Sequence, residues 1–129
     1  MEYTEFITHV QSLAQSNSRE EAERATHATL GTIKELIPNH EAQEIAAQLP
    51  EELGKSLSGK EAEPTQSFHL QEFIERTSHK ENIEPTTAAI HVRAVFAVLQ
   101  NAITPDQFRK FHTYFSHDYE ELFATSTTS

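Results

Sequence analysis

The sequence of 129 residues contains no cysteine, no tryptophan and only three glycines. Without cysteine the chain forms no disulfide, no thiolate metal site, no iron–sulfur cluster and no thiol nucleophile. A domain of this length removes about two-thirds of its unfolded surface from water, so it builds a hydrophobic core without such cross-links. Because no cysteine spacing indicates an oxidising compartment, we expect a cytoplasmic protein.

Positive charge and long apolar runs are also scarce. There are 10 Lys and Arg against 20 Asp and Glu, which gives a formal net charge of −10. Affinity for nucleic acid comes from clustered cations, so we expect no nucleic-acid partner. The longest apolar run, around Val95 to Leu99, is far shorter than the roughly 20 residues of a membrane-spanning helix. The acidic start, Met1 to Glu5, precedes no apolar stretch, so we expect neither a membrane span nor a secretory signal.

What the chain has in abundance is apolar residues at helical spacing, whereas strict alternation of apolar and polar residues is absent. We therefore predict an all-α fold. Ser18 with Glu21, and Thr104 with Gln107, have the spacing of capping boxes, in which each side chain bonds to the other residue's backbone. Prolines mark further boundaries. The clearest predicted helices span about 4–15, 19–37, 40–48, 51–57 and 86–103.

The order of these elements repeats along the chain. Residues 5–7 (Glu-Phe-Ile) reappear as residues 72–74, and residues 20–57 align without a gap onto 86–123 with apolar matched to apolar. We interpret this as a duplication, with chance similarity between two amphipathic helical hairpins as the alternative. The prediction is one domain over 1–129 made of two fused four-helix pseudo-repeats in a bundle-like arrangement. Its parts are pseudo-repeat 1 at about 4–57, a linker at 58–67, pseudo-repeat 2 at about 68–124 and a frayed tail at 125–129.

The helix predicted over 86–103 is apolar almost all round, which places it in the middle of the core. Its counterpart over 19–37 is more polar on one side and is expected nearer to solvent. Gly31 aligns with Ala97, and small residues at a shared position allow two helix backbones to approach closely. We therefore expect the two long helices to cross there.

The pattern resembles the DUF2267 family of small bacterial helical proteins, which have two related halves and no assigned function. The resemblance implies an all-helical tandem fold and no established activity. In that family an Arg precedes the Ala of the long helix in both halves; here Arg93 is kept and His27 stands at the matching place. The Leu-Pro step is kept in the first half only. The residues that carry the resemblance are 5–7, 22–30, Ile33, 48–50, Leu53, 72–74, 91–99 and 119–123.

We find no constellation for metal binding or catalysis. His112, His117 and Asp118 form the tightest group, but the two His are five residues apart across a predicted helix break, unlike the i, i+4 pair of zinc-binding helices. We expect both to be solvated, and no nucleophile elbow or phosphate-binding loop is present. The predictions are therefore no cofactor, no metal and no enzymatic activity. The other His considered, at positions 9, 40, 69 and 79, are expected at the surface.

Arg93 is the residue that we single out, because it lies within the most apolar helix and its charge needs a partner. We predict that its stem packs in the core and its head pairs with a carboxylate such as Asp118, Glu72 or Glu75, or caps helix carbonyls. Removal of such a buried anchor costs about 3–5 kcal/mol. In the alternative, Arg93 lines a cleft and holds an anion, with His27 and Arg24 on the matching surface of the first half.

The sequence therefore favours a non-enzymatic interaction or scaffold module, a monomer or weak homo-oligomer. It would bind another protein through a groove between the repeats or an exposed apolar face. The alternatives are a carrier of a small ligand or anion with an internal pocket near Arg93, and an uncharacterised enzyme.

Overall fold

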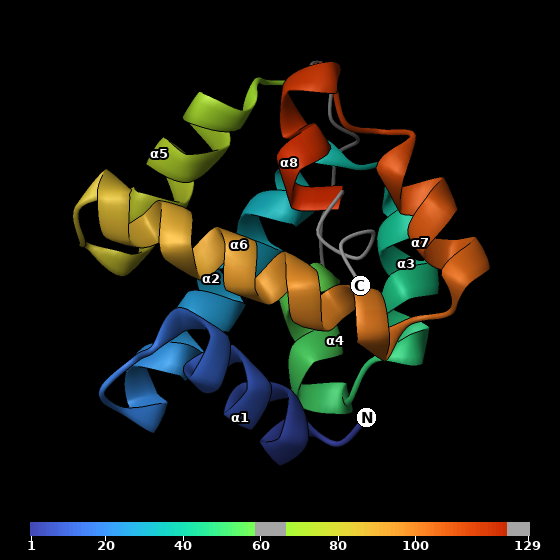
Figure 1. Ribbon diagram of the computed structural model, residues 1–129. Helices are drawn as coiled ribbons and strands as arrows, with labels where there is room; N and C mark the ends of the chain where they lie inside the picture. Colours follow the sequence, from blue (N-terminus) through green and yellow to red (C-terminus); the bar gives the residue numbers. More distant parts are fainter. Residues whose placement is uncertain (59–66, 124–129) are drawn as a thin grey trace.

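The computed structural model describes residues 1–58 and 67–123, and within these ranges it contains helices and no strand (Figure 1). The all-α prediction is confirmed. Most of the predicted linker and the whole predicted tail lie outside the described residues. The elements are α1 (Tyr3–Ala14), α2 (Arg19–Leu36), α3 (Asn39–Gln48), α4 (Glu51–Leu57), α5 (Leu70–Glu81), α6 (Pro85–Ala102), α7 (Pro105–His112), the 3-10 turn η1 (His117–Tyr119) and α8 (Glu120–Phe123).

The predicted caps begin two of these helices, but only half of each capping box forms. The hydroxyl of Ser18 accepts a hydrogen bond from the Glu21 amide at 3.1 Å, and that of Thr104 accepts one from the Gln107 amide at 3.2 Å. The side chains of Glu21 and Gln107 do not complete the boxes. They bond to side chains of other helices instead, which gives them a tertiary role that local spacing does not indicate.

Helices α1 and α5 end in the same way, at residues in the left-handed conformation. Gln15 has a φ of 53° and Asn82 a φ of 58°. In each case the amide of the next residue donates to a carbonyl five residues earlier, at 3.0 Å and 3.1 Å respectively. This bonding pattern satisfies carbonyls that the helix end would otherwise leave open.

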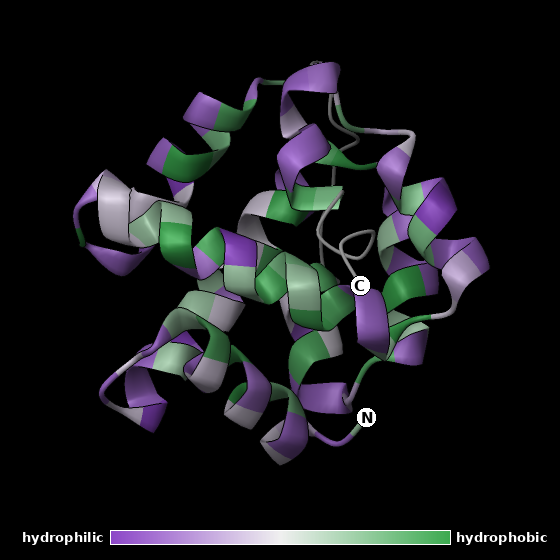
Figure 2. Ribbon diagram, in the orientation of Figure 1, coloured by the Kyte–Doolittle hydropathy of each residue, from purple (hydrophilic) through white to green (hydrophobic). Residues whose placement is uncertain are grey.

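Helix α6 lies at the centre of the molecule and contacts α1, α2, α5 and α8. Figure 1 shows it crossing the middle of the fold, and Figure 2 shows hydrophobic residues along most of its length. Fully buried Phe96 is its centre of packing. Four aromatic rings have centroids 5.6–5.8 Å from that of Phe96, namely those of Phe73, Phe111, Phe115 and Phe123.

The two halves interlock rather than lying side by side. Helix α1 packs on α2 and on α6, while α5 packs on α6 and on α2, so each short helix bridges both long ones. One hydrophobic cluster contains residues of both halves. Helices α1 and α5 are both 12 residues long, and α2 and α6 are both 18. That the halves superpose stays a prediction.

The expected role of Gly31 and Ala97 in a crossing of α2 and α6 is wrong. A Cβ atom on Gly31 would meet the stem of Lys80, with Cε 3.4 Å away, so this position faces α5. Ala97 instead lines a hollow together with Leu13 of α1. Gly31 thus leaves room for the Lys80 side chain of α5, although α2 and α6 do contact each other.

Candidate functional site

An open apolar groove lies between α1 and α6. It has a volume of about 310 Å³ and is lined by Leu13 of α1 and by Ile90, Arg93, Ala94 and Ala97 of α6. The α6 residues recur at spacings of three and four, so they form one stripe of the helix. The side chains of Leu13 and Ile90 are conspicuous, because these large hydrophobic residues are 56% and 47% exposed. We call these five residues the α1–α6 groove.

Arg93 lies at this groove, and its position differs from the predicted buried anchor. Its Nη2 atom donates to Glu121 of α8 at 2.8 Å, and the two side chains are 53% and 55% exposed. The pairing with a carboxylate forms, but with Glu121 rather than with Asp118, Glu72 or Glu75. Arg93 shares the solvent-facing stripe of α6 with Ile90, whereas the buried stripe contains residues such as Val92 and Phe96. Solvent therefore screens the ion pair.

His27 and Arg24 lie together, but at a different hollow from that of Arg93. This polar hollow of about 450 Å³ is also lined by Tyr3, Glu20 and Glu23. The ring of His27 has its Nδ1 atom 2.8 Å from the Ser56 hydroxyl and its Nε2 atom 3.3 Å from the Tyr3 hydroxyl. Both ring nitrogens thus contact the protein's own side chains.

Tyr3 continues this hydrogen-bonded chain by donating to Glu23 at 2.9 Å. Burial, that hydrogen bond and the charge of Glu23 together raise the pKa of Tyr3 to about 12. With Tyr3 donating to Glu23, its oxygen accepts from the Nε2–H of His27. Sequence reasoning did not find Ser56 beside His27, because the two residues are far apart in the chain. The contacts connect α1, α2 and α4.

His91 is the buried charged residue of α6, and sequence reasoning missed it. Its side chain is 2% exposed. The Nδ1 atom lies 2.9 Å and 3.1 Å from the two oxygens of Glu81, and the Nε2 atom lies 3.0 Å from Glu21. Burial lowers the pKa of His91, but the hydrogen bonds and charges of Glu81 and Glu21 outweigh it, so the pKa is raised. The imidazolium therefore bridges α5, α6 and α2.

A signal for His91 was present in the sequence. Residues three and four positions away on one helix share a face; for His91 these are Thr87, Ala88, Ala94 and Val95, and the last three are buried. A histidine on an apolar stripe, two residues from Arg93, therefore faces the core while Arg93 faces outward. The carboxylate partners of His91 could not be identified in the same way, because Glu81 lies on another helix and Glu21 lies 70 residues away.

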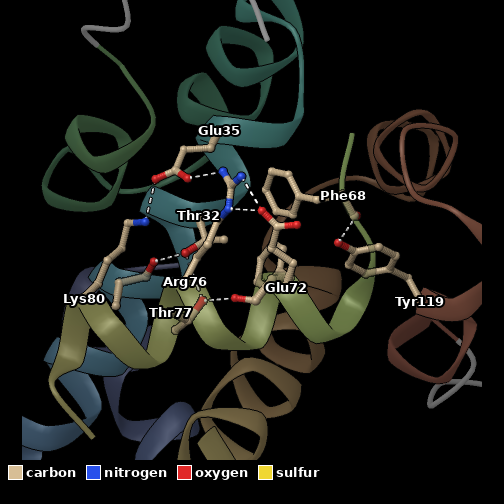
Figure 3. Close-up of polar contacts among 10 residues, drawn as sticks. Thr32, Glu35, Phe68, Glu72, Arg76, Thr77, Lys80 and Tyr119 are labelled. Carbon is tan, nitrogen blue, oxygen red and sulfur yellow. Dashed lines mark hydrogen bonds and ion pairs between the residues drawn. The ribbon is translucent and has the colours of Figure 1, made fainter. Parts of the chain in front are cut away.

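A second polar cluster joins α2 to α5 (Figure 3). Glu35 accepts from Arg76 at 2.8 Å and from Lys80 at 2.5 Å, and Arg76 also donates to Glu72. The Arg76 guanidinium lies 3.8 Å from the centroid of the Phe68 ring, which adds a cation–π contact. The same two helices are also joined by buried Thr32 and Thr77, whose hydroxyl oxygens are 2.9 Å apart.

A third polar cluster joins α3 to α7 around Gln107. Its side-chain amide donates to Glu41 at 2.8 Å and to Glu44 at 3.2 Å, and its oxygen accepts from Gln48 at 3.3 Å. Glu41 is 1% exposed, and this burial raises the pKa of its carboxyl group. The polar clusters around His91, Arg76 and Gln107 thus join helices of the first half to helices of the second.

Two of the residues weighed for metal binding, His112 and Asp118, have other partners, and His117 is exposed as expected. His112 bonds to Glu120 at 2.6 Å and stacks on the Phe123 ring at 4.1 Å, so it is more enclosed than expected. Asp118 accepts from the Leu70 amide at 2.7 Å and from the Ser116 hydroxyl. Within residues 1–58 and 67–123, no group of three or more His, Cys, Asp or Glu is arranged to hold a metal ion.

Comparison with known proteins assigns a family but no activity. None of the described helices is both long enough and apolar enough to cross a membrane. A search of curated proteins finds no match to the chain. A family profile described as "Uncharacterized conserved protein (DUF2267)" matches residues 3–122. Since this match covers nearly the whole sequence, the chain belongs to the DUF2267 family.

Proposed function

We propose that this protein is a non-enzymatic binding module and that its α1–α6 groove receives apolar side chains of another protein. The observation that carries the proposal is the exposure of Leu13 and Ile90 on the two sides of one groove. Among the described residues, Met1 is the only other large hydrophobic side chain that is exposed. Adjacent exposed apolar side chains are typical of interaction surfaces.

The partners of the polar side chains support a non-enzymatic role. His91 is held by two glutamates, and both nitrogens of His27 contact Ser56 and Tyr3. Gln107 and Arg76 connect helices of the two halves. These groups stabilise the fold, whereas a catalytic site presents its acid, base or nucleophile to a substrate.

A carrier of a small anionic ligand is the second candidate function, favoured by Arg93 at the groove. The groove volume of about 310 Å³ is at the lower end of the range of small-ligand sites. Glu121 already pairs with Arg93 and competes with any anion. The carrier hypothesis predicts that phosphate or acetate raises the melting temperature of the parent but not that of Arg93→Ala.

The experiment that tests the proposed function places a photo-crosslinking amino acid at Ile90 in the full chain and irradiates cells that produce it. We expect a crosslinked protein at this position that is lost when Leu13→Glu is introduced on the opposite side of the groove. The matched control is the same crosslinker at exposed Gln43 on α3. Equal capture at both positions, or capture unaffected by Leu13→Glu, would contradict the proposal.

A further inference from the structure

We infer that the occupant of the α1–α6 groove is a short amphipathic helix of the partner with a basic polar face. The inference rests on the proposed function and adds the shape and charge of the partner. Three properties of the groove carry it: its length along α6, its size compared with a protein dimer interface, and its charge.

The length of the groove fits two turns of helix. Its α6 residues run from Ile90 to Ala97, a rise of about 10 Å at 1.5 Å per residue. Ala94 and Ala97 have small side chains, which allow another backbone to approach closely, and Leu13 and Ile90 are the large side chains beside them. Apolar side chains at positions i and i+4 of a partner helix lie on one face, about one turn apart, and therefore fit within this length. They would pack between Leu13 and Ile90.

The size of the groove excludes a second copy of the chain that is held by this surface alone. A stable dimer interface uses about 20–30 residues on each side. The groove has five lining residues. A helix that presents two or three apolar side chains needs no larger surface, and helix-in-groove recognition uses such side chains as its anchors.

Charge decides which kind of helix binds. Within the groove the only charged lining residue is Arg93, and its pairing with Glu121 neutralises the local charge. An approaching helix therefore experiences mainly the electrostatic field of the whole chain, whose net charge is −10. That field attracts a basic helix and repels an acidic one, most strongly at low salt.

The test uses three fluorescent synthetic peptides with the full chain. The first is an amphipathic helix with Leu at positions i, i+4 and i+7 and Lys on its polar face. The second replaces each Lys by Glu, and the third has the composition of the first in a scrambled, non-amphipathic order. Anisotropy titrations measure the dissociation constants for the parent, for Ile90→Ser in the groove, and for Met1→Ser as a matched change of an exposed apolar residue outside it.

We expect the Lys peptide to bind the parent at least about ten-fold more tightly than either other peptide. We also expect Ile90→Ser, but not Met1→Ser, to weaken its binding about ten-fold. Equal binding of the scrambled Lys peptide, equal effects of the two variants, or no binding at all would overturn the inference. If no peptide binds while crosslinking at Ile90 is still specific, the inference fails and the proposed function stands. Loss of both results refutes both.

Discussion

Replacement of His91 by alanine tests the polar centre of the fold. The side chains of His91 and Glu81 are 2% and 1% exposed, so removal of the imidazole leaves the Glu81 carboxylate buried without its cation. Breaking a buried ion pair in this way costs about 3–5 kcal/mol. Glu21 is 30% exposed and can regain water, so it adds little to this figure. We expect His91→Ala to lower the free energy of unfolding by about that amount at pH 7.

The pH dependence identifies the cause of that loss. Because the pKa of His91 is raised in the folded protein, its stabilisation is complete below its unfolded value of about 6.5 and is lost as pH rises through the folded value. The deficit of the variant should therefore be largest near pH 6 and shrink as pH rises toward 9. Urea unfolding at pH 6, 7 and 9 measures this trend.

Two further variants control this experiment. The double change His91→Leu with Glu81→Leu removes both buried charges, and we expect it to recover most of the stability because apolar pairs often replace buried ion pairs at no cost. His117 is exposed, so His117→Ala should change the unfolding free energy by less than about 0.5 kcal/mol. If His91→Ala were as stable as His117→Ala at pH 7, the assignment of His91 as a buried ionic anchor would be refuted.

Three other predictions concern single sites. Arg93→Ala should lower the free energy of unfolding by at most about 1 kcal/mol, because its ion pair is exposed; a loss above about 3 kcal/mol in urea titration would restore the buried-anchor hypothesis. Ala28→Leu and Ala94→Leu should each lower the free energy of unfolding by about 1–3 kcal/mol, because these residues are 8% and 4% exposed and a larger side chain overpacks them. If both variants melted like the parent, these positions would not be equivalent buried contacts. Hydrogen bonds from the Leu70 amide and then from Ser116 lower the pKa of Asp118 to about 2. The parent should therefore have a higher free energy of unfolding than Asp118→Asn above about pH 4, and this difference should vanish toward pH 2. A difference that does not change with pH would contradict this.

Local sequence signals predicted the helices well, because each boundary depends on a few neighbouring residues. Ser18, Thr104 and the prolines mark helix starts through hydrogen bonds and backbone restrictions that act within one turn. The left-handed ends at Gln15 and Asn82 were not predicted, since glycine is the usual residue there. The burial pattern was also predictable, as Leu30 and the aligned Phe96 are both fully buried.

The candidate site was predictable only in part, because it depends on contacts between distant residues. The sequence identified Arg93 as a candidate residue, but its exposure depends on which stripe of α6 faces outward. Because α6 is apolar nearly all round, its sequence does not indicate which stripe that is. His91 is the buried ionic anchor of α6, the role that we predicted for Arg93, whereas Arg93 is exposed. Leu13 stands at helical spacing from buried Val10 on α1, and its exposure depends on where α1 crosses α6.

The measurement that tests the proposed function most directly is methyl NMR of the full chain during titration with the protein captured at Ile90. Leu13 and Ile90 carry methyl groups in the groove, and Met1 carries an exposed methyl outside it, which makes an internal control. We expect the resonances of Leu13, Ile90, Ala94 and Ala97 to shift together while that of Met1 stays in place. Unchanged groove methyls at saturating partner would contradict binding at the α1–α6 groove.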